Sequence, residues 1–149
     1  MKKMIIITGG AGFVGSNMIS LLLKKTRYNI ISIDNYSTGS IKNHIKNKRI
    51  KYINSDTKNI KKKLDKSKNK IHSLFHFGEF SRIYQSFSKM DECISSNTIG
   101  SSEVFKFCLS NQIKLIYSAT SASLGRKNED KNLSPYAFTK SRNLELLNN

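Results

Sequence analysis

Residues 4–15 read MIIITGGAGFVG, and this stretch decides the fold. Its first four residues are apolar and β-prone, which predicts a buried strand at Met4–Ile7. A glycine-rich turn follows the strand. Beyond the turn, apolar side chains recur at the spacing of one helical face, at Val14, Met18, Leu21 and Leu22. The sequence therefore predicts a strand, a tight glycine turn and a helix from about Phe13 to Lys25.

The same alternation continues along the rest of the chain. Further strands are predicted at residues 29–34, 50–54, 71–77 and 113–117, with a lysine-rich helix or turn after the third strand. Long helices are predicted at about residues 89–111 and 134–147, the second led by Ser134-Pro135. This order is typical of an α/β fold. We predict a Rossmann-type doubly wound parallel sheet of about five strands in one domain, residues 1–149, with ligands at the carboxyl ends of the strands.

Composition excludes several classes of protein. No apolar run approaches the roughly 20 residues of a membrane span, and the amino terminus does not resemble a signal peptide. Cys93 and Cys108 are predicted to be reduced thiols on one helix, and no Cys/His spacing indicates a metal site. We therefore expect a cytoplasmic protein without a metal.

The net charge of +16, from 26 Lys+Arg against 10 Asp+Glu, is also typical of nucleic-acid binders. Many of these cations lie between Lys42 and Lys70, where Tyr52 is the only aromatic residue. Lysine, asparagine and isoleucine are abundant throughout the chain, so a general compositional bias accounts for the charge equally well. We favour a solvated lysine surface over a nucleic-acid site.

The glycine turn predicts a phosphate-binding loop. Gly9, Gly12 and Gly15 have the spacing G-x-x-G-x-x-G directly between a strand and a helix. The first glycine permits the tight turn, the second admits a pyrophosphate, and the third allows close packing. Asp34 ends the next strand, 19 residues after Gly15, where a carboxylate accepts hydrogen bonds from ribose hydroxyls and repels a 2′-phosphate. The pattern favours NAD over NADP. The alternative is a structural glycine turn beside a capping aspartate.

A second group of residues predicts acid–base chemistry. Tyr136 and Lys140 are four residues apart and share one helical face. A tyrosine hydroxyl titrates near pH 10, so a nearby ammonium is needed to make it an effective base at neutral pH. The fifth strand ends in hydroxyl-bearing residues, among them Thr120, which is placed to hydrogen-bond a substrate hydroxyl beside Tyr136.

Together these residues resemble the NAD-dependent epimerase/dehydratase family of extended short-chain dehydrogenases/reductases. The similarity is greatest to the amino-terminal half of UDP-glucose 4-epimerases. It runs from Met4 to about Leu147 and rests on the following motifs: Gly9–Gly15, Asp34–Gly39, Asp56, Phe75–Phe77, Asn97, Ser118–Gly125, and Ser134-Pro135-Tyr136 with Lys140. The resemblance implies that the Rossmann domain is incomplete at its carboxyl end and that a substrate-binding lobe is absent.

The resemblance also implies a role for each motif. The catalytic residues would be Thr120, Tyr136 and Lys140. The NAD-binding residues would be Gly9, Gly12, Phe13, Val14, Gly15, Asp34, Asn35, Ser37, Asp56, Thr57, Phe77, Gly78, Asn97, Tyr136 and Lys140. The implied reaction takes a nucleotide sugar through a transient 4-keto sugar, with Tyr136 removing the hydroxyl proton. The implied assembly is a homodimer through the long and final helices.

Two positions bear on the substrate. Sugar 4,6-dehydratases carry an Asp-Glu pair after the catalytic threonine, whereas this chain has Ser121 and Ala122, which disfavours dehydration. Glu79 replaces a residue that is usually small in 4-epimerases, so a heptose-nucleotide epimerase remains an alternative. Glu79 is expected either near the bound phosphates or exposed and pointing away. Alternatives of another class are a catalytically silent NAD-binding remnant and a basic nucleic-acid-binding domain.

Overall fold

The computed structural model describes residues 3–121 and 133–148 of the chain. They divide into two units, each considered by itself. Unit 1 consists of the residues up to Gly78 together with Glu103–Tyr117, and unit 2 consists of Glu79–Ser102 together with the residues from Ser118 onward.

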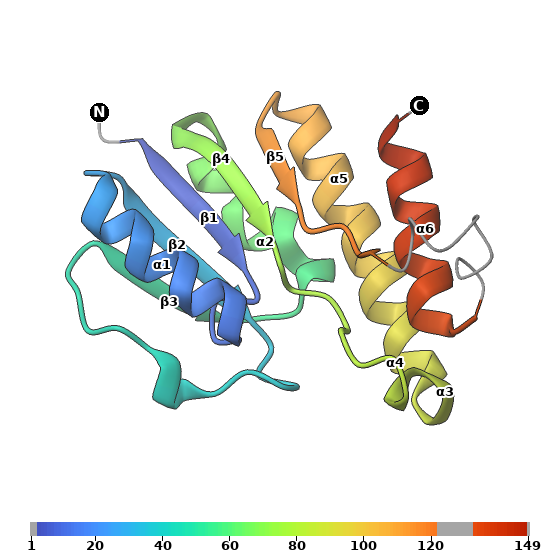
Figure 1. Ribbon diagram of the computed structural model, residues 1–149. Helices are drawn as coiled ribbons and strands as arrows, with labels where there is room; N and C mark the ends of the chain where they lie inside the picture. The colour runs from blue at the N-terminus through green and yellow to red at the C-terminus, as the bar shows by residue number, and fades with distance from the viewer. Residues whose placement is uncertain (1–2, 122–132, 149) are drawn as a thin grey trace. The chain divides into compact units, whose positions relative to one another are not determined.

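Unit 1 is built on a parallel sheet of five strands (Figure 1). The strands are β1 (Met4–Thr8), β2 (Asn29–Asp34), β3 (Ile50–Asn54), β4 (Ile71–His76) and β5 (Lys114–Tyr117). Their order in the sheet is β3-β2-β1-β4-β5, so the direction of winding reverses between β1 and β4. This order is that of a Rossmann fold, and it confirms the predicted fold class. The carboxyl ends of β1 and β4 flank the reversal, where such sheets bind their ligands.

The alternation of side chains along β1 supplies both halves of the core. Ile5 and Ile7 point to one face, where they pack with Ile19 of helix α1 (Phe13–Lys25). Ile6 points to the other face and packs with Leu64 of α2 (Ile60–Leu64) and Val104 of α5 (Ser101–Ser110). All six side chains are inaccessible or nearly inaccessible to solvent. The sheet is therefore covered on both faces, as its continuous apolar strands require.

Several predicted boundaries match the structure. Helix α1 and strands β2 and β3 have the bounds predicted from the sequence, and β1, β4 and β5 differ by one residue. The lysine-rich segment after β3 forms the short helix α2 between two 3-10 turns, η2 (Thr57–Asn59) and η3 (Asp65–Lys70). The segment before β3, predicted as a loop or short helix, contains one 3-10 turn, η1 (Ile41–Asn43).

Unit 2 contains the helices α3 (Gln85–Ser88), α4 (Met90–Ile94) and α6 (Pro135–Asn148). The long helix predicted at about 89–111 is present from Met90 to Ser110, but its middle is a π-helical segment, η4 (Ser95–Gly100), between α4 and α5, which the sequence did not predict. In α6, the predicted cap is confirmed: the Ser134 hydroxyl accepts a hydrogen bond of 3.0 Å from the Ala137 amide, and Pro135 opens the helix.

Both cysteines are buried free thiols, in agreement with the prediction. Burial raises the pKa of Cys93 above its ordinary value and that of Cys108 to about 12. Neither thiol therefore ionises at neutral pH. In the part of the chain that is described, no helix has the length and apolar character needed to cross a bilayer.

Candidate functional site

The glycine turn of unit 1 has the geometry predicted for its first and third glycines. Gly9 has a φ of +71°, and a Cβ there would lie 2.6 Å from the Phe77 carbonyl oxygen. A Cβ on Gly15 would lie 2.2 Å from the Gly9 carbonyl oxygen. Both contacts are with backbone, which has little freedom to move. Side chains at either position are therefore incompatible with this turn.

Gly12 is different, because space remains around it. A Cβ there would meet one neighbouring atom within 4 Å, the Gly9 carbonyl oxygen at 3.3 Å. Gly12 is also the N-cap of α1, and no side chain caps the helix. The first turn carries no acidic residue, and Phe13 and Val14 within it are 83% and 54% exposed. An open helix amino terminus of this kind fits a phosphate, which the helix dipole and the amides of the first turn attract.

Asp34 holds the glycine turn in place. Its carboxylate is nearly buried and accepts hydrogen bonds from the amides of Ala11, at 2.9 Å, and Tyr36, at 2.8 Å. These contacts join the end of β2 to the turn after β1. Asp34 thus has a structural role in the turn, although it is not the N-cap of α1, which is Gly12. This role is compatible with ribose binding, since a carboxylate has about four acceptor positions and two of them are used by these amides.

The other predicted adenosine-binding residues gather beside Asp34. The Asn35 amide donates a bond of 3.3 Å to the Asp56 carboxylate, which also accepts from the Lys58 amide at 2.9 Å. Thr57 is buried, whereas Ser37 is exposed, and the Ser37 amide donates to Asn35 at 3.1 Å. The ends of β2 and β3 therefore bring a cluster of polar groups together, as the parallel sheet predicts.

The end of β4 is tied to β1 through a hydroxyl. The Gly78 amide donates to the Thr8 hydroxyl at 3.0 Å, and this hydroxyl contacts Nδ1 of the buried His76 at 2.6 Å. A Cβ on Gly78 would lie 2.9 Å from the Gly9 amide nitrogen. Phe77 and Gly78 thus lie directly beside the glycine turn. Sequence reasoning missed Thr8 and His76 as the residues that hold this contact.

In unit 2, the predicted catalytic lysine is buried and paired with a carboxylate. The Lys140 ammonium donates to Glu79 and to the Ser118 carbonyl oxygen. The side chains of Lys140 and Glu79 are each 4% exposed. Of the two alternatives for Glu79, the one with an exposed side chain is therefore wrong. Two more donors reach the same carboxylate: the Ser101 hydroxyl at 2.7 Å and the Asn143 amide at 3.1 Å.

Asn97, at the centre of the π-helical segment, is fully buried. Its side chain accepts from the Phe80 amide at 2.6 Å, and donates to the Phe80 carbonyl at 3.0 Å and to the Thr139 hydroxyl at 3.2 Å. These bonds fix the chain that follows Glu79 against α6. The residue therefore positions this segment, and its predicted contact with a cofactor stays a prediction.

Tyr136 lies one helical turn before Lys140 on α6, and its amide donates to the Ser86 hydroxyl at 3.3 Å. The Tyr136 side chain is half-buried, as is Thr120 in the segment after β5. Ser121 is exposed. The remainder of the predicted hydroxyl-rich motif, from Ala122 to Gly125, lies outside the described residues.

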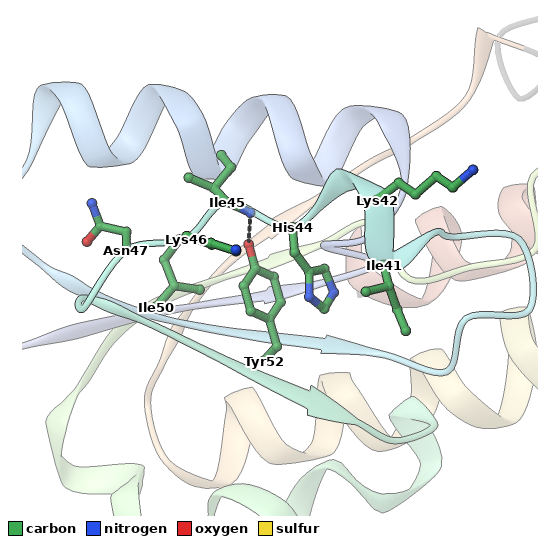
Figure 2. Close-up of a pocket in the computed structure, with 8 residues that line it drawn as sticks. All are labelled: Ile41, Lys42, His44, Ile45, Lys46, Asn47, Ile50 and Tyr52. Atoms are coloured by element: carbon green, nitrogen blue, oxygen red, sulfur yellow. Dashed lines mark hydrogen bonds between the residues drawn. The ribbon is translucent and has the colours of Figure 1, made fainter.

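Unit 1 has a further hollow, which none of the predicted site residues lines (Figure 2). The His44 ring stacks on Tyr52 with centroids 3.7 Å apart, and the Tyr52 hydroxyl accepts a bond of 2.8 Å from the Ile45 amide. The His44 Nε2 atom lies 3.0 Å from the hydroxyl of Tyr36, whose pKa is raised by burial and by the Asp34 carboxylate. The hollow is thus built on hydrogen-bonded aromatic rings next to the loop that follows β2.

Comparison with protein families identifies the sequence pattern. The model of the family described as "NAD dependent epimerase/dehydratase family" matches residues 5–148. The chain belongs to this family. This membership confirms the resemblance inferred from the motifs. It also confirms two predictions at the level of the family, namely that NAD is the cofactor and that the members are enzymes.

Solved structures of epimerases have the same fold. A UDP-N-acetylglucosamine 4-epimerase from Methanobrevibacter ruminantium is 27% identical with a TM-score of 0.83, over 99% of this chain and 50% of its own. The UDP-Glc/GlcNAc 4-epimerase of Campylobacter jejuni is 25% identical with a TM-score of 0.85, over 98% and 48%. A UDP-glucose 4-epimerase from Thermotoga maritima, at 22% identity and a TM-score of 0.84, shares the fold over 97% and 50%. The chain therefore spans about half the length of these epimerases.

The buried pair of Glu79 and Lys140 is a second feature that sequence reasoning missed. Glu79 was recognised as unusual, but its partners are 22 to 64 residues away along the chain. The one available signal was its position directly after Gly78, at the end of a strand that leads to the ligand-binding edge.

Proposed function

We propose that this chain is the cofactor-binding part of an NAD-dependent nucleotide-sugar epimerase of the UDP-glucose 4-epimerase type. The observation that carries the proposal is the glycine turn, which is closed to side chains at Gly9 and Gly15 and open at Gly12. This geometry suits a pyrophosphate at the amino terminus of α1. Membership of the epimerase/dehydratase family gives the site its chemistry.

In unit 1, we assign the pyrophosphate to the turn at Gly12, Phe13 and Val14, and the adenosine ribose to Asp34 and Asn35. The exposed apolar surface of Phe13 and Val14 is available to cover the cofactor. Asp56 and Thr57 are proposed for the adenine, and Phe77 and Gly78 for the middle of the dinucleotide. Asp34 rejects a 2′-phosphate through like-charge repulsion, which favours NAD.

In unit 2, we assign the acid–base step to Tyr136. Bound NAD supplies the acceptor and donor of hydride. Tyr136 takes the proton of the sugar 4-hydroxyl and later returns it, with Thr120 hydrogen-bonded to the same hydroxyl. Lys140 binds the nicotinamide ribose. When the sugar loses a hydride to NAD, it also loses one proton to Tyr136, and it regains both in the return step. The overall reaction is therefore an isomerisation.

The substrate and the assembly belong to the same proposal. A UDP-hexose is supported by the two similar structures that are at least 25% identical, which are 4-epimerases of UDP-linked glucose or N-acetylglucosamine. A heptose nucleotide is the alternative suggested by Glu79.

A homodimer is supported by exposed apolar side chains on the helices of unit 2: Ile94, Ile99, Phe138, Leu146 and Leu147. A cytoplasmic location is supported by the two free cysteines, since reducing compartments keep thiols unpaired.

A catalytically silent NAD-binding protein is the second candidate. It is favoured by one observation: the Lys140 ammonium is already hydrogen-bonded to Glu79 and to the Ser118 carbonyl. A lysine held by the protein in this way has less freedom to bind a cofactor ribose. Both candidates predict that the chain binds NAD, but only the epimerase predicts turnover of a nucleotide sugar.

Turnover by the full 149-residue chain separates them. Incubation with NAD⁺ and UDP-galactose is expected to give UDP-glucose, measured by chromatography of the nucleotide sugars. Tyr136→Phe is expected to lower the rate at least 100-fold, because it removes the acid–base group. The matched control is Tyr84→Phe, which removes a hydroxyl from an exposed tyrosine of unit 2. Absence of product while NAD⁺ is bound would support the silent candidate for the 149-residue chain, whereas absence of NAD⁺ binding would contradict the proposed cofactor-binding function.

A further inference from the structure

Glu79 is the acceptor at the centre of a buried polar cluster in unit 2. One carboxylate oxygen accepts from Ser101 and Asn143, and the other accepts from the Lys140 ammonium. Three donors therefore point at one side chain. An ionised carboxylate can accept from all three, whereas a protonated carboxyl or an amide would turn a donor of its own toward one of them. The direct contact with the Lys140 ammonium, together with the donors on the other carboxylate oxygen, favours a negative charge at Glu79.

This negative charge changes what Lys140 presents to a ligand. Lysine and glutamate side chains are almost never fully buried unless they are paired. Here both are buried to the same degree and in direct contact, so their electric fields largely cancel at distances greater than the separation of the two charges. A lysine alone at this position would present a net charge of +1. The pair presents a net charge of zero and keeps the ammonium as a hydrogen-bond donor.

We infer that Glu79 is a positioning residue that sets the preference of the site for oxidised over reduced nicotinamide cofactor. This inference rests on the proposed function, in which Lys140 binds the nicotinamide ribose. The nicotinamide ring of NAD⁺ carries a positive charge and that of NADH does not. A bare ammonium beside the ring disfavours the oxidised form, and Glu79 offsets this repulsion. Because an epimerase must start each cycle with NAD⁺, this charge balance supports its resting state.

The two cofactor forms give a sensitive measurement that does not depend on turnover. NAD⁺ and NADH share the adenosine, the pyrophosphate and both riboses. A substitution that only loosens the structure therefore weakens the binding of NAD⁺ and NADH equally. A substitution that changes the local charge alters the affinity for NAD⁺ relative to that for NADH. The quantity to measure is the ratio of the two dissociation constants, by calorimetry for NAD⁺ and by fluorescence for NADH.

Glu79→Gln is expected to weaken NAD⁺ binding relative to NADH binding at least about tenfold, because removing one unit charge within about 12 Å of the ring has an effect of this size or larger at an effective dielectric constant of about 20. Lys140→Met is expected to move the ratio in the opposite direction. The double variant Glu79→Gln/Lys140→Met restores a net charge of zero, and its ratio is expected to return to within about threefold of that of the unmodified chain. Glu92→Gln, which removes an exposed carboxylate of unit 2, is the matched control and should leave the ratio unchanged.

The outcomes distinguish this inference from the proposed function. If both forms bind but Glu79→Gln weakens them equally, Glu79 is only structural and the inference is wrong. The inference is also contradicted if the double variant has the same ratio of dissociation constants as Glu79→Gln, instead of a ratio close to that of the unmodified chain. Should Glu79→Gln fail to fold, as judged by circular dichroism, the opposite shift in Lys140→Met and its reversal in the double variant decide the question. Binding of neither form by the unmodified chain would overturn the proposed function, and the inference with it.

Discussion

Gly15→Ala is expected to destabilise unit 1 by about 3 kcal/mol and to weaken NAD⁺ binding at least 100-fold. The reason is steric: the added methyl group would lie 2.2 Å from the Gly9 carbonyl oxygen and 2.7 Å from the Gly10 Cα atom. Overpacking of this kind costs about 1–3 kcal/mol where the surroundings can relax. Here the neighbours are backbone atoms of the turn, so relief of the clash must distort the phosphate-binding loop. Urea unfolding and titration calorimetry measure the two effects.

Gly12→Ala is the matched control for this prediction. Its methyl group would meet one atom within 4 Å, the Gly9 carbonyl oxygen at 3.3 Å. The free energy of unfolding is therefore expected to change by less than about 1 kcal/mol. NAD⁺ binding should still fall at least tenfold, because the methyl group occupies space that the pyrophosphate needs. Unchanged NAD⁺ affinity in Gly12→Ala would place the phosphates elsewhere and refute the assignment of this loop.

The second large effect concerns the buried ion pair. Glu79→Leu or Lys140→Met alone is expected to lower the free energy of unfolding by about 3–5 kcal/mol, because each leaves an uncompensated buried charge. The double variant Glu79→Leu/Lys140→Met is expected to lose much less than the sum of the single variants, since it leaves neither charge behind. Denaturation in urea, followed by circular dichroism, gives all three values.

An exposed pair in the same unit provides the comparison. Lys89 and Glu92 lie 3.2 Å apart, with side chains 50% and 58% exposed. Glu92→Ala should cost less than about 1 kcal/mol, because water screens the pair and solvates the remaining lysine. If Glu79→Leu proves as mild as Glu92→Ala, then the Lys140 ammonium does not depend on Glu79, and the buried pair described above is wrong.

Local patterns explain why parts of the fold could be predicted from the sequence. Helix α1 was located because its apolar spacing and the glycine turn before it are both short-range features. The bounds of β2 followed from a run of β-branched residues that ends in Asp34. The Ser134 cap also depends on neighbours within one turn. Each of these predictions needed only residues that are close along the chain.

The remaining features depend on contacts that no local pattern encodes. The role of Glu79 is set by Lys140 and Asn143, 61 and 64 residues further along. The π-helical segment was missed because apolar periodicity does not distinguish an α-helical turn from a π-helical one. Asn97 was assigned to the cofactor by resemblance, and its bonds to Phe80 became visible only in the fold. Polar clusters of this kind assemble only after the chain has folded.

The central claim is that unit 1 binds NAD through the glycine turn and Asp34, and equilibrium binding of the full chain to NAD⁺ and NADP⁺ tests it most directly. We expect NAD⁺ to bind at one site per chain and NADP⁺ to bind at least tenfold more weakly, because the Asp34 carboxylate repels a 2′-phosphate. Asp34→Asn removes the negative charge and keeps one acceptor oxygen, which can serve the Ala11 amide or the Tyr36 amide, and it should reduce the ratio of the two dissociation constants. Asp65→Asn, at an exposed carboxylate of the same unit, should leave this ratio unchanged. No binding of NAD⁺ at millimolar concentration would contradict the account.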